Sequence, residues 1–419
     1  MKRNYLIVLL IFFVFFVISF LTNILGPLIP DIIKGFHLSL TLAGFLPFAF
    51  FIAYGVMSIP SGMLVERYGE KPVMVGAFVM AFFGALFFAL MPVYSVAMVS
   101  LFMIGVGMAM LQVAINPLLR VAGGEEHFAF NSVLAQLVFG SASFLSPFLY
   151  SYLVHQLQTD PPNGPWFIDV LHRLVPPNLP WVSLYWVFAL TTLLMIFILY
   201  FVHLPRVELQ EDEKAGAWQT HKKLFKNKTV ILFFIGIFAY VGTEQGVANW
   251  ISKFLQTYHG FDPQTVGAHT VSLFWGLLTA GCLLGLLLLK LFDSRHVLIT
   301  FAGAAIIALT FALFGSAQTA LYAFPMVGFF ASVMWSVIFS LALNSLEKHH
   351  GSFSGILCTG IIGGAIVPVI IGWLGDHFGL RTGMMFLYLT LGYIFSVGFW
   401  AKPLITNKTF RTKAKEQAA

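Results

Sequence analysis

Twelve long apolar segments constrain this chain more than any other feature of its sequence. Each has about the 20 residues that a helix needs to cross a bilayer core of roughly 30 Å. Transmembrane strands would alternate in polarity over short segments, whereas Leu6–Ile18 and Phe82–Leu90 are apolar all round. The sequence therefore predicts an all-α membrane protein with twelve transmembrane helices. The expected spans are 5–32, 41–65, 72–92, 94–119, 127–156, 182–203, 229–257, 264–289, 296–315, 320–344, 352–374 and 383–401.

Composition excludes a soluble protein and several classes of function. Hydrophobic residues make up 59% of the 419 positions and charged residues only 10%, against about 25% charged in soluble domains. The net charge of +6 is dispersed among short loops, so nucleic acid is not an expected partner. The sequence shows no nucleotide-binding loop, zinc-protease motif, hydrolase elbow or cysteine pair. We expect no enzyme and no cofactor.

Charge distribution predicts the topology and the domain organisation. With the N-terminus inside, 19 of the 23 Lys and Arg face the cytoplasm, and only Lys34, Arg173, Lys253 and Arg381 lie outside. The positive-inside rule then places both termini in the cytoplasm, in a multi-pass protein of the plasma (inner) membrane. A charged cytoplasmic linker, 205–228, separates a six-helix bundle at 1–204 from a second at 229–401, and 402–419 form a cytoplasmic tail. An outer segment around Trp166–Leu174 suggests a short surface helix or lid.

Glu244 is the sharpest single candidate for chemistry. Of the seventeen acids it alone falls near the middle of a span, where a charge costs at least about 2.5 kcal/mol. Its nearest basic residue along the helix is Lys253, roughly 13 Å away at 1.5 Å per residue. The carboxyl group is therefore either protonated or compensated by a cation that binds and leaves. A transported Na⁺ beside Glu244 is the one metal that we expect.

Neutral polar and aromatic residues surround this acid on otherwise apolar spans. Gln112 and Asn116 share one face of a helix because they are four apart, and so do Gln245 and Asn249. Amides donate and accept hydrogen bonds, and aromatic rings cover the C–H patches of a sugar ring, so the mixture suits a neutral polyhydroxylated ligand. A helix–helix hydrogen bond is the alternative for each amide. The full set of expected substrate-binding residues is Asn23, Gln112, Asn116, Gln136, Gln245, Asn249, Trp275 and Trp335.

Residues 62–71, between the second and third spans, carry a specific motif. They resemble the G-x-L-x-[D/E]-R-x-G-x-[K/R] signature of the major facilitator superfamily. The resemblance implies the major facilitator fold, in which two six-helix bundles rock against each other. It also implies that Gly62, Glu66, Arg67 and Gly69 take part in conformational gating at the cytoplasmic side. A similar string at 372–381 falls outside in the expected topology, and we expect no such gating role for it.

Other strings narrow the resemblance. Phe48–Tyr54, Leu111–Pro117, Tyr240–Glu244, Gly328–Trp335 and Gly363–Pro368 resemble the fucose and glucose/galactose symporter family. The resemblance implies uptake of a neutral sugar coupled to H⁺ or Na⁺, with Gln112, Asn116, Gln136, Glu244 and Trp335 at positions similar to motif residues of that family.

The sequence departs from that family at three places. Its fucose-type members carry an acid in the first helix and another in the fourth, but the corresponding stretches Asn23–Pro27 and Leu111–Gln112 contain none. Gly281 and Cys282 stand where the family often has Gly-Arg. Asp31 lies near the outer end of its span, so Glu244 is the candidate for coupling that is left.

The sequence thus predicts a monomeric secondary transporter in the lipid bilayer that carries a neutral sugar such as a hexose with Na⁺ or H⁺ by alternating access. Within transport, the alternatives are an exporter of amphipathic compounds that exchanges drug for proton, and an uncoupled sugar facilitator. A non-transporting membrane sensor is the alternative from another class, although no sizeable soluble domain exists to relay a signal. Flux of sugar in sealed vesicles separates these alternatives.

Overall fold

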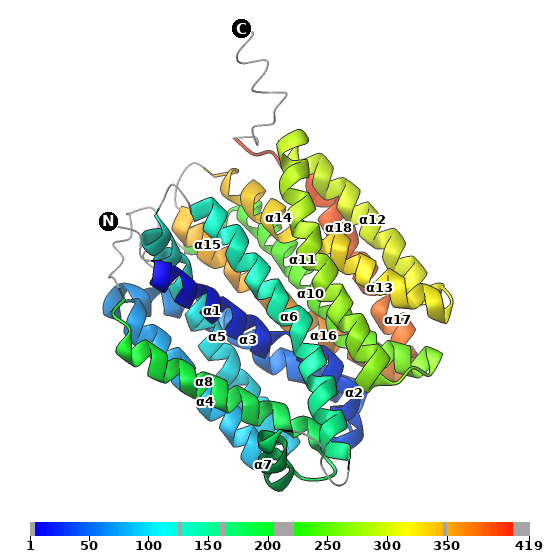
Figure 1. The fold of residues 1–419 in the computed structure, drawn as a ribbon. Coiled ribbons are helices and arrows are strands. Elements are labelled where there is room, and N and C mark those ends of the chain that lie inside the picture. The colour runs from blue at the N-terminus through cyan, green and yellow to red at the C-terminus, as the bar shows by residue number, and fades with distance from the viewer. Residues whose placement is uncertain (1–4, 125–127, 160–164, 205–221, 347–349, 405–419) are drawn as a thin grey trace.

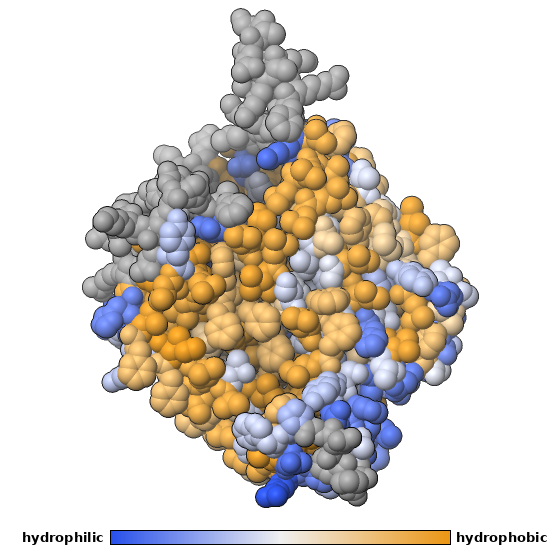
Figure 2. All heavy atoms as spheres, viewed as in Figure 1, coloured by the Kyte–Doolittle hydropathy of each residue, from blue (hydrophilic) through white to orange (hydrophobic). Residues whose placement is uncertain are grey.

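The computed structural model describes residues 5–124, 128–159, 165–204, 222–346 and 350–404, and every regular element in these ranges is a helix. Twelve helical segments are long and apolar enough to cross a bilayer. Figure 1 shows them packed side by side, and Figure 2 shows hydrophobic residues over most of the middle of one face. The expected all-α fold with twelve spans is confirmed.

The helices follow the expected order. The first half of the chain contains α1 (Tyr5–Thr22), α2 (Leu25–Phe36), α3 (Leu40–Tyr68), α4 (Glu70–Leu90), α5 (Tyr94–Gly123), α6 (Phe128–Gln158), α7 (Trp166–Leu174), η2 (Pro180–Val182) and α8 (Ser183–Phe201). The second half contains α10 (Lys228–His259), η4 (Pro263–Gly267), α11 (Ala268–Leu291), α12 (Ser294–Phe314), α13 (Ala317–Ala331), α14 (Met334–Leu343), α15 (His350–Thr359), η5 (Gly360–Ile362), α16 (Gly363–Phe378), α17 (Leu380–Met384) and α18 (Leu387–Trp400). The suggested surface helix is α7.

Four of the expected spans are interrupted, although each still forms one segment long enough to cross the membrane. The first is split between α1 and α2 at Asn23 and Ile24, and the tenth between α13 and α14. The eleventh and twelfth are each split into shorter helices. Pro27 explains the first break, because it has no N–H to give the carbonyl of Asn23 and its ring would clash with that carbonyl in a continuous helix. The tenth span has no proline at the equivalent distance from its break.

The two ends of the described chain lie on one side of the molecule. The number of spans is even, so the start of α1 and the end of α18 are on the same side, toward the top of Figure 1. We call this side the terminal face and the other side the opposite face. The expected linker 205–228 and tail 402–419 fall largely outside the described residues, so the bundle boundaries stay predictions.

The two halves of the chain meet mainly through α3 against α16, α6 against α11 and α2 against α10, and α15 also packs against α3. Glycines permit the closest of these approaches. A Cβ on Gly26 would lie 2.3 Å from the carbonyl oxygen of Ala248, and one on Gly44 would lie 2.8 Å from that of Pro368. Both pairs lie in the halves of their membrane spans that are farther from the terminal face. The halves are therefore closed against each other at the opposite face.

Candidate functional site

Glu244 lies in the middle of α10 and is half-buried. The hydroxyl of Tyr240, one turn earlier, donates a hydrogen bond to its Oε2. The amide of Gln245 donates to its Oε1 at 3.2 Å. Within the described part of the chain, no Lys or Arg forms an ion pair with this carboxyl group. The site is thus a carboxyl group held by two neutral donors. When it is ionised, none of these partners neutralises its negative charge, so a cation could do so.

Three of the predicted amides form a network at the contact between the two halves. Gln245 Nε2 donates to Asn23 Oδ1 at 3.5 Å, which joins α10 to the break between α1 and α2. Asn249 Nδ2 donates to Gln245 Oε1 at 3.3 Å, and Asn23 Nδ2 donates to Ser143 Oγ on α6 at 2.8 Å. All three amides are buried. In this conformation they bind one another. For Asn23 and Gln245 these bonds join different helices, which is the alternative that the sequence left open, whereas the bonds of Asn249 stay within α10.

The other predicted amides are more accessible. Asn116 and Gln136 are exposed and Gln112 is half-buried. Asn116 Nδ2 donates to the backbone carbonyl of Gln112 at 3.1 Å, so these two residues share a face of α5 as expected. Among the described residues, neither Gln112 nor Gln136 makes a side-chain hydrogen bond to the group around Glu244.

The two predicted tryptophans lie in different surroundings. Trp335, at the start of α14, is half-buried, and its ring centroid is 6.0 Å from that of Tyr240, the hydroxyl donor to Glu244. It also stacks on Phe339. Trp275 on α11 is 3% exposed and packs edge-on against Phe274, and its indole N–H has no hydrogen-bond partner among the described protein atoms. The structure therefore brings Trp335 to the site and places Trp275 within the packing.

The motif at residues 62–71 lies at the turn between α3 and α4, as expected. Gly69 has φ of +82°, a conformation that side chains disfavour, and its N–H bonds to the carbonyl of Val65. Gly62 is half-buried and Glu66 is exposed. The guanidinium of Arg67 lies 5.3 Å from the ring centre of Tyr68. The assigned gating role stays a prediction.

Asp376, in the similar string at 372–381, forms a contact that the sequence did not reveal. Its carboxylate accepts hydrogen bonds from the backbone N–H groups of Leu40 and Thr41, each at 2.8 Å. These groups begin α3, so the contact joins the two halves at the opposite face. The glycine and acid pattern of residues 62–71 recurs at 372–381, and this recurrence is a signal that could have pointed to Asp376 as a contact residue. The sequence did not show that the start of α3 lies beside it.

Asp31 on α2 is a second acid whose role the sequence did not reveal. It is 9% exposed, and its Oδ2 accepts a hydrogen bond of 2.6 Å from the hydroxyl of Tyr150 on α6. Gln264, in η4 of the other half, donates to the same oxygen at 3.1 Å. Asp31 is therefore buried in the contact between the halves, and its side-chain hydrogen bonds from Tyr150 and Gln264 come from neutral donors.

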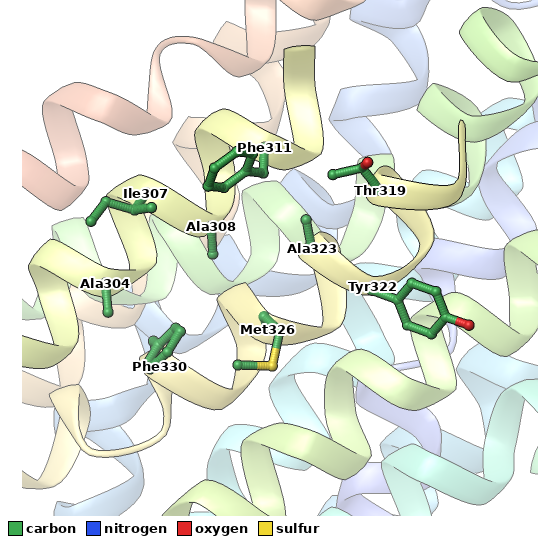
Figure 3. A pocket seen from close by; sticks show the side chains of 9 residues that line it. All are labelled: Ala304, Ile307, Ala308, Phe311, Thr319, Tyr322, Ala323, Met326 and Phe330. Atoms are coloured by element: carbon green, nitrogen blue, oxygen red, sulfur yellow. The ribbon is translucent and has the colours of Figure 1, made fainter. Parts of the chain in front are cut away.

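A groove on the outside of the second half contains none of the predicted residues. It lies between α12 and α13, has a volume of about 490 Å³ and is lined by residues such as Ile307, Phe311, Met326 and Phe330 (Figure 3). Its lining surface is apolar, and the hydroxyl of Tyr322 points away from it (Figure 3). A sugar would find few hydrogen-bonding groups there.

Comparison with known proteins decides the family. The family model described as Major Facilitator Superfamily matches residues 11–368. The chain belongs to the major facilitator superfamily. Members of this superfamily are membrane transporters and not enzymes, which confirms the expected class.

Relatives and solved structures agree with this assignment. A glucose/galactose transporter of Brucella abortus biovar 1 (strain 9-941) is 33% identical over 385 residues, covering 91% of this chain and 90% of the relative. The E. coli fucose:proton symporter has a similar structure, with a TM-score of 0.68 and 22% identity over 96% of this chain and all of that one. A bacterial homologue of the lysosomal transporter Spinster has a TM-score of 0.78 at 15% identity, over 94% of this chain and 97% of its own. The two structures show the major facilitator fold.

Proposed function

We propose that the protein is a secondary active transporter that carries a neutral sugar such as a hexose together with Na⁺ or H⁺. The relatives support the substrate class, because the Brucella abortus protein is a glucose/galactose transporter and the E. coli protein is a fucose:proton symporter. The single observation that carries the coupling is Glu244, a half-buried carboxyl group in mid-helix with two neutral donors. A charge so placed favours binding of a small cation.

The arrangement of the two halves supports the proposal of alternating access. We take residues 1–204 and 229–401 as the bundles that move, with 205–228 as the cytoplasmic linker. We take the terminal face as the cytoplasmic one, because only four of the 23 Lys and Arg, namely Lys34, Arg173, Lys253 and Arg381, fall at the opposite face in the expected topology. The conformation described here is then closed toward the outside, by the contacts of α3 with α16 and α6 with α11.

The accessible residues are the ones proposed to bind the sugar in this conformation. Gln112, Asn116 and Gln136 have exposed surface to offer donors and acceptors, and Trp335 offers a ring beside the Tyr240–Glu244 pair. Asn23, Gln245 and Asn249 are engaged with one another and become accessible only when the halves separate.

Energetically, a single coupled cation is sufficient for accumulation. One charge that crosses 100 mV releases about 2.3 kcal/mol, and about 1.4 kcal/mol corresponds to a tenfold concentration ratio. Coupling of one cation to one sugar therefore supports more than tenfold accumulation. An uncoupled facilitator would reach the same sugar concentration on both sides.

The test is transport by the purified protein in proteoliposomes. A panel of radiolabelled hexoses is offered in counterflow and in net uptake, with and without Na⁺ and across pH. We expect one sugar to be concentrated only with a Na⁺ or proton gradient, and Glu244→Gln to lose that concentration. Gln318→Leu, an exposed amide on α13 away from Glu244, serves as the matched control. A flux that equilibrates without either cation would show a facilitator, and export of amphipathic compounds without sugar flux would show the exporter.

A further inference from the structure

Gln245 joins the carboxylate of Glu244 to the other half of the protein. Its Nε2 donates to Glu244 Oε1 at 3.2 Å and to Asn23 Oδ1 at 3.5 Å, while its Oε1 accepts from Asn249 Nδ2 at 3.3 Å. A primary amide has two N–H donors, and both are used. The side chain is 4% exposed, so water does not offer easy substitutes for these partners. The amide group of Gln245 therefore links Glu244, the candidate cation-binding residue, to Asn23 in the first half of the chain.

The hydrogen bonds continue in one direction beyond Asn23. Because Asn23 Nδ2 donates to Ser143 Oγ, the Ser143 hydroxyl has its own hydrogen to give to Ser19 Oγ, 2.5 Å away. The Ser19 hydroxyl in turn donates to the carbonyl oxygen of Phe139, also at 2.5 Å. Both serines are fully buried. This chain of hydrogen bonds begins on α10, passes through the break between α1 and α2, and ends at a backbone carbonyl of α6.

The charge on Glu244 sets the orientation of the Gln245 amide. An ionised carboxylate attracts the N–H side and repels the oxygen side of its neighbour, and this orientation is also the one that bonds to Asn23 Oδ1. A cation at Glu244 prefers oxygen ligands, so it favours the reversed amide, with Oε1 turned toward the carboxyl group. Asn23 Oδ1 would then face an oxygen instead of an N–H. An attraction between the two halves becomes a repulsion.

Few other titratable groups compete with the influence of Glu244 on the orientation of the Gln245 amide. Within the described residues, the titratable groups that interact with Glu244 are the hydroxyl of Tyr240 and the thiol of Cys282 on α11. Close packing also holds the amide in place, since a Cβ on Gly364 would lie only 3.1 Å from Gln245 Cγ. The amide can turn about its last bond, but its stem has little freedom to move away.

We propose that Gln245 is a positioning residue that transmits the occupancy of Glu244 to the contact between the halves through Asn23. The proposal rests on the proposed function, because it needs a cation that binds at Glu244. With Glu244 empty, the bridge to Asn23 helps to keep the opposite face closed. With a cation bound, the bridge is lost and that face opens. A carrier that holds a cation alone then stays open to the outside until its sugar arrives, which limits leakage of the ion.

The test measures the separation of the two halves at the opposite face. Spin labels are placed at Gln158→Cys, at the end of α6, and at Thr257→Cys, near the end of α10, both of which are exposed. Cys282→Ala and Cys358→Ala remove the native thiols. In this labelled parent, Na⁺ or a lower pH is expected to shift the ratio of long to short distances by about two- to tenfold, the range that one net hydrogen bond supplies.

Two shape-conserving variants decide the proposal. Gln245→Met and Asn23→Leu remove the bridge from either side with little change in volume, and each is expected to abolish the cation-dependent shift. Gln318→Leu should shift as the parent does. Monodisperse size-exclusion profiles show that each variant is folded. If the parent and Glu244→Gln differ but Gln245→Met still shifts like the parent, this inference is overturned and the proposed function stands. If the parent responds to neither Na⁺ nor pH, the coupling at Glu244 itself is wrong.

Discussion

Asp376 at the end of α16 caps Thr41 at the start of α3, in the other half of the protein. Its Oδ2 accepts hydrogen bonds from the Thr41 N–H at 2.8 Å and the Thr41 hydroxyl at 2.5 Å. The first N–H groups of a helix have no partner within the helix and carry the positive end of its dipole. A carboxylate from the opposing bundle satisfies them. This contact can form only while the opposite face is closed.

Removal of the charge at Asp376 should weaken that closure. Asp376→Asn keeps one acceptor oxygen but loses the attraction to the helix end, so we expect a larger open population at the opposite face. The effect should be under about 1 kcal/mol, because the site is exposed and screened, and it should shrink at high salt. The spin-label distances between residues 158 and 257 measure it. Asp169→Asn, an exposed acid on α7, is the control, and an identical response of both variants would contradict the capping role.

The buried acid Asp31 should be coupled energetically to Tyr150. The hydroxyl of Tyr150 donates to Asp31 Oδ2 at 2.6 Å in a buried setting, so Tyr150→Phe removes the shorter of the two hydrogen bonds to that oxygen and leaves only the one from Gln264 at 3.1 Å. We expect a loss of about 1–3 kcal/mol in thermal unfolding in detergent. A double-mutant cycle with Asp31→Asn should show that the two losses are not additive. Tyr322→Phe, whose hydroxyl is exposed, should cost much less. Additive losses would mean that the hydrogen bond contributes little.

The sequence predicted the fold well because span length and polarity are local properties. Most of the expected spans agree with the helices to within a few residues, and the short helix at Trp166–Leu174 was found from its apolar stretch between prolines. The breaks were missed where hydropathy continues across them. At Asn23 the interruption is set by Pro27, four residues later, which a hydropathy window does not register.

The candidate site was predictable in its members but not in their pairing. The central position of Glu244 could be read from the sequence, and so could the shared helix faces of Gln112 with Asn116 and Gln245 with Asn249. The partition into buried and accessible amides depends on which helices of the two halves touch. For the same reason the sequence could not reveal that Asp376 would reach α3. Such contacts join residues more than 200 positions apart.

Asp293 should stabilise the start of α12 in a pH-dependent way. Its carboxylate pairs with the Arg295 guanidinium at 3.0 Å and accepts a hydrogen bond from the Arg295 backbone N–H at 2.8 Å, and these contacts lower the pKa of Asp293 below its usual range. A carboxylate whose pKa is lowered by folding contributes stability above its unfolded pKa and loses it as the pH falls through the folded pKa. Asp293→Ala should therefore cost about 1 kcal/mol at neutral pH, as for other helix caps, and progressively less in acid. Thermal unfolding of both proteins from neutral to acidic pH measures the difference. A constant difference at all pH values would contradict the ionic contribution.

Gly26 should be required for the closed conformation, because α2 passes close to the backbone of α10 at this residue. A Cβ there would lie 2.3 Å from the carbonyl oxygen of Ala248, a backbone atom that cannot move aside as a side chain would. Gly26→Ala should therefore force α2 and α10 apart, lengthen the distance between residues 158 and 257 and slow sugar counterflow, which requires repeated closure at this face. Gly392→Ala on α18 is the matched control, since nothing lies within 4 Å of its added Cβ and alanine favours a helix over glycine. Closure at the opposite face needs the backbones of α2 and α10 to touch, so a Gly26→Ala protein with the parent's distances and counterflow rate would show that the transport cycle does not pass through this contact.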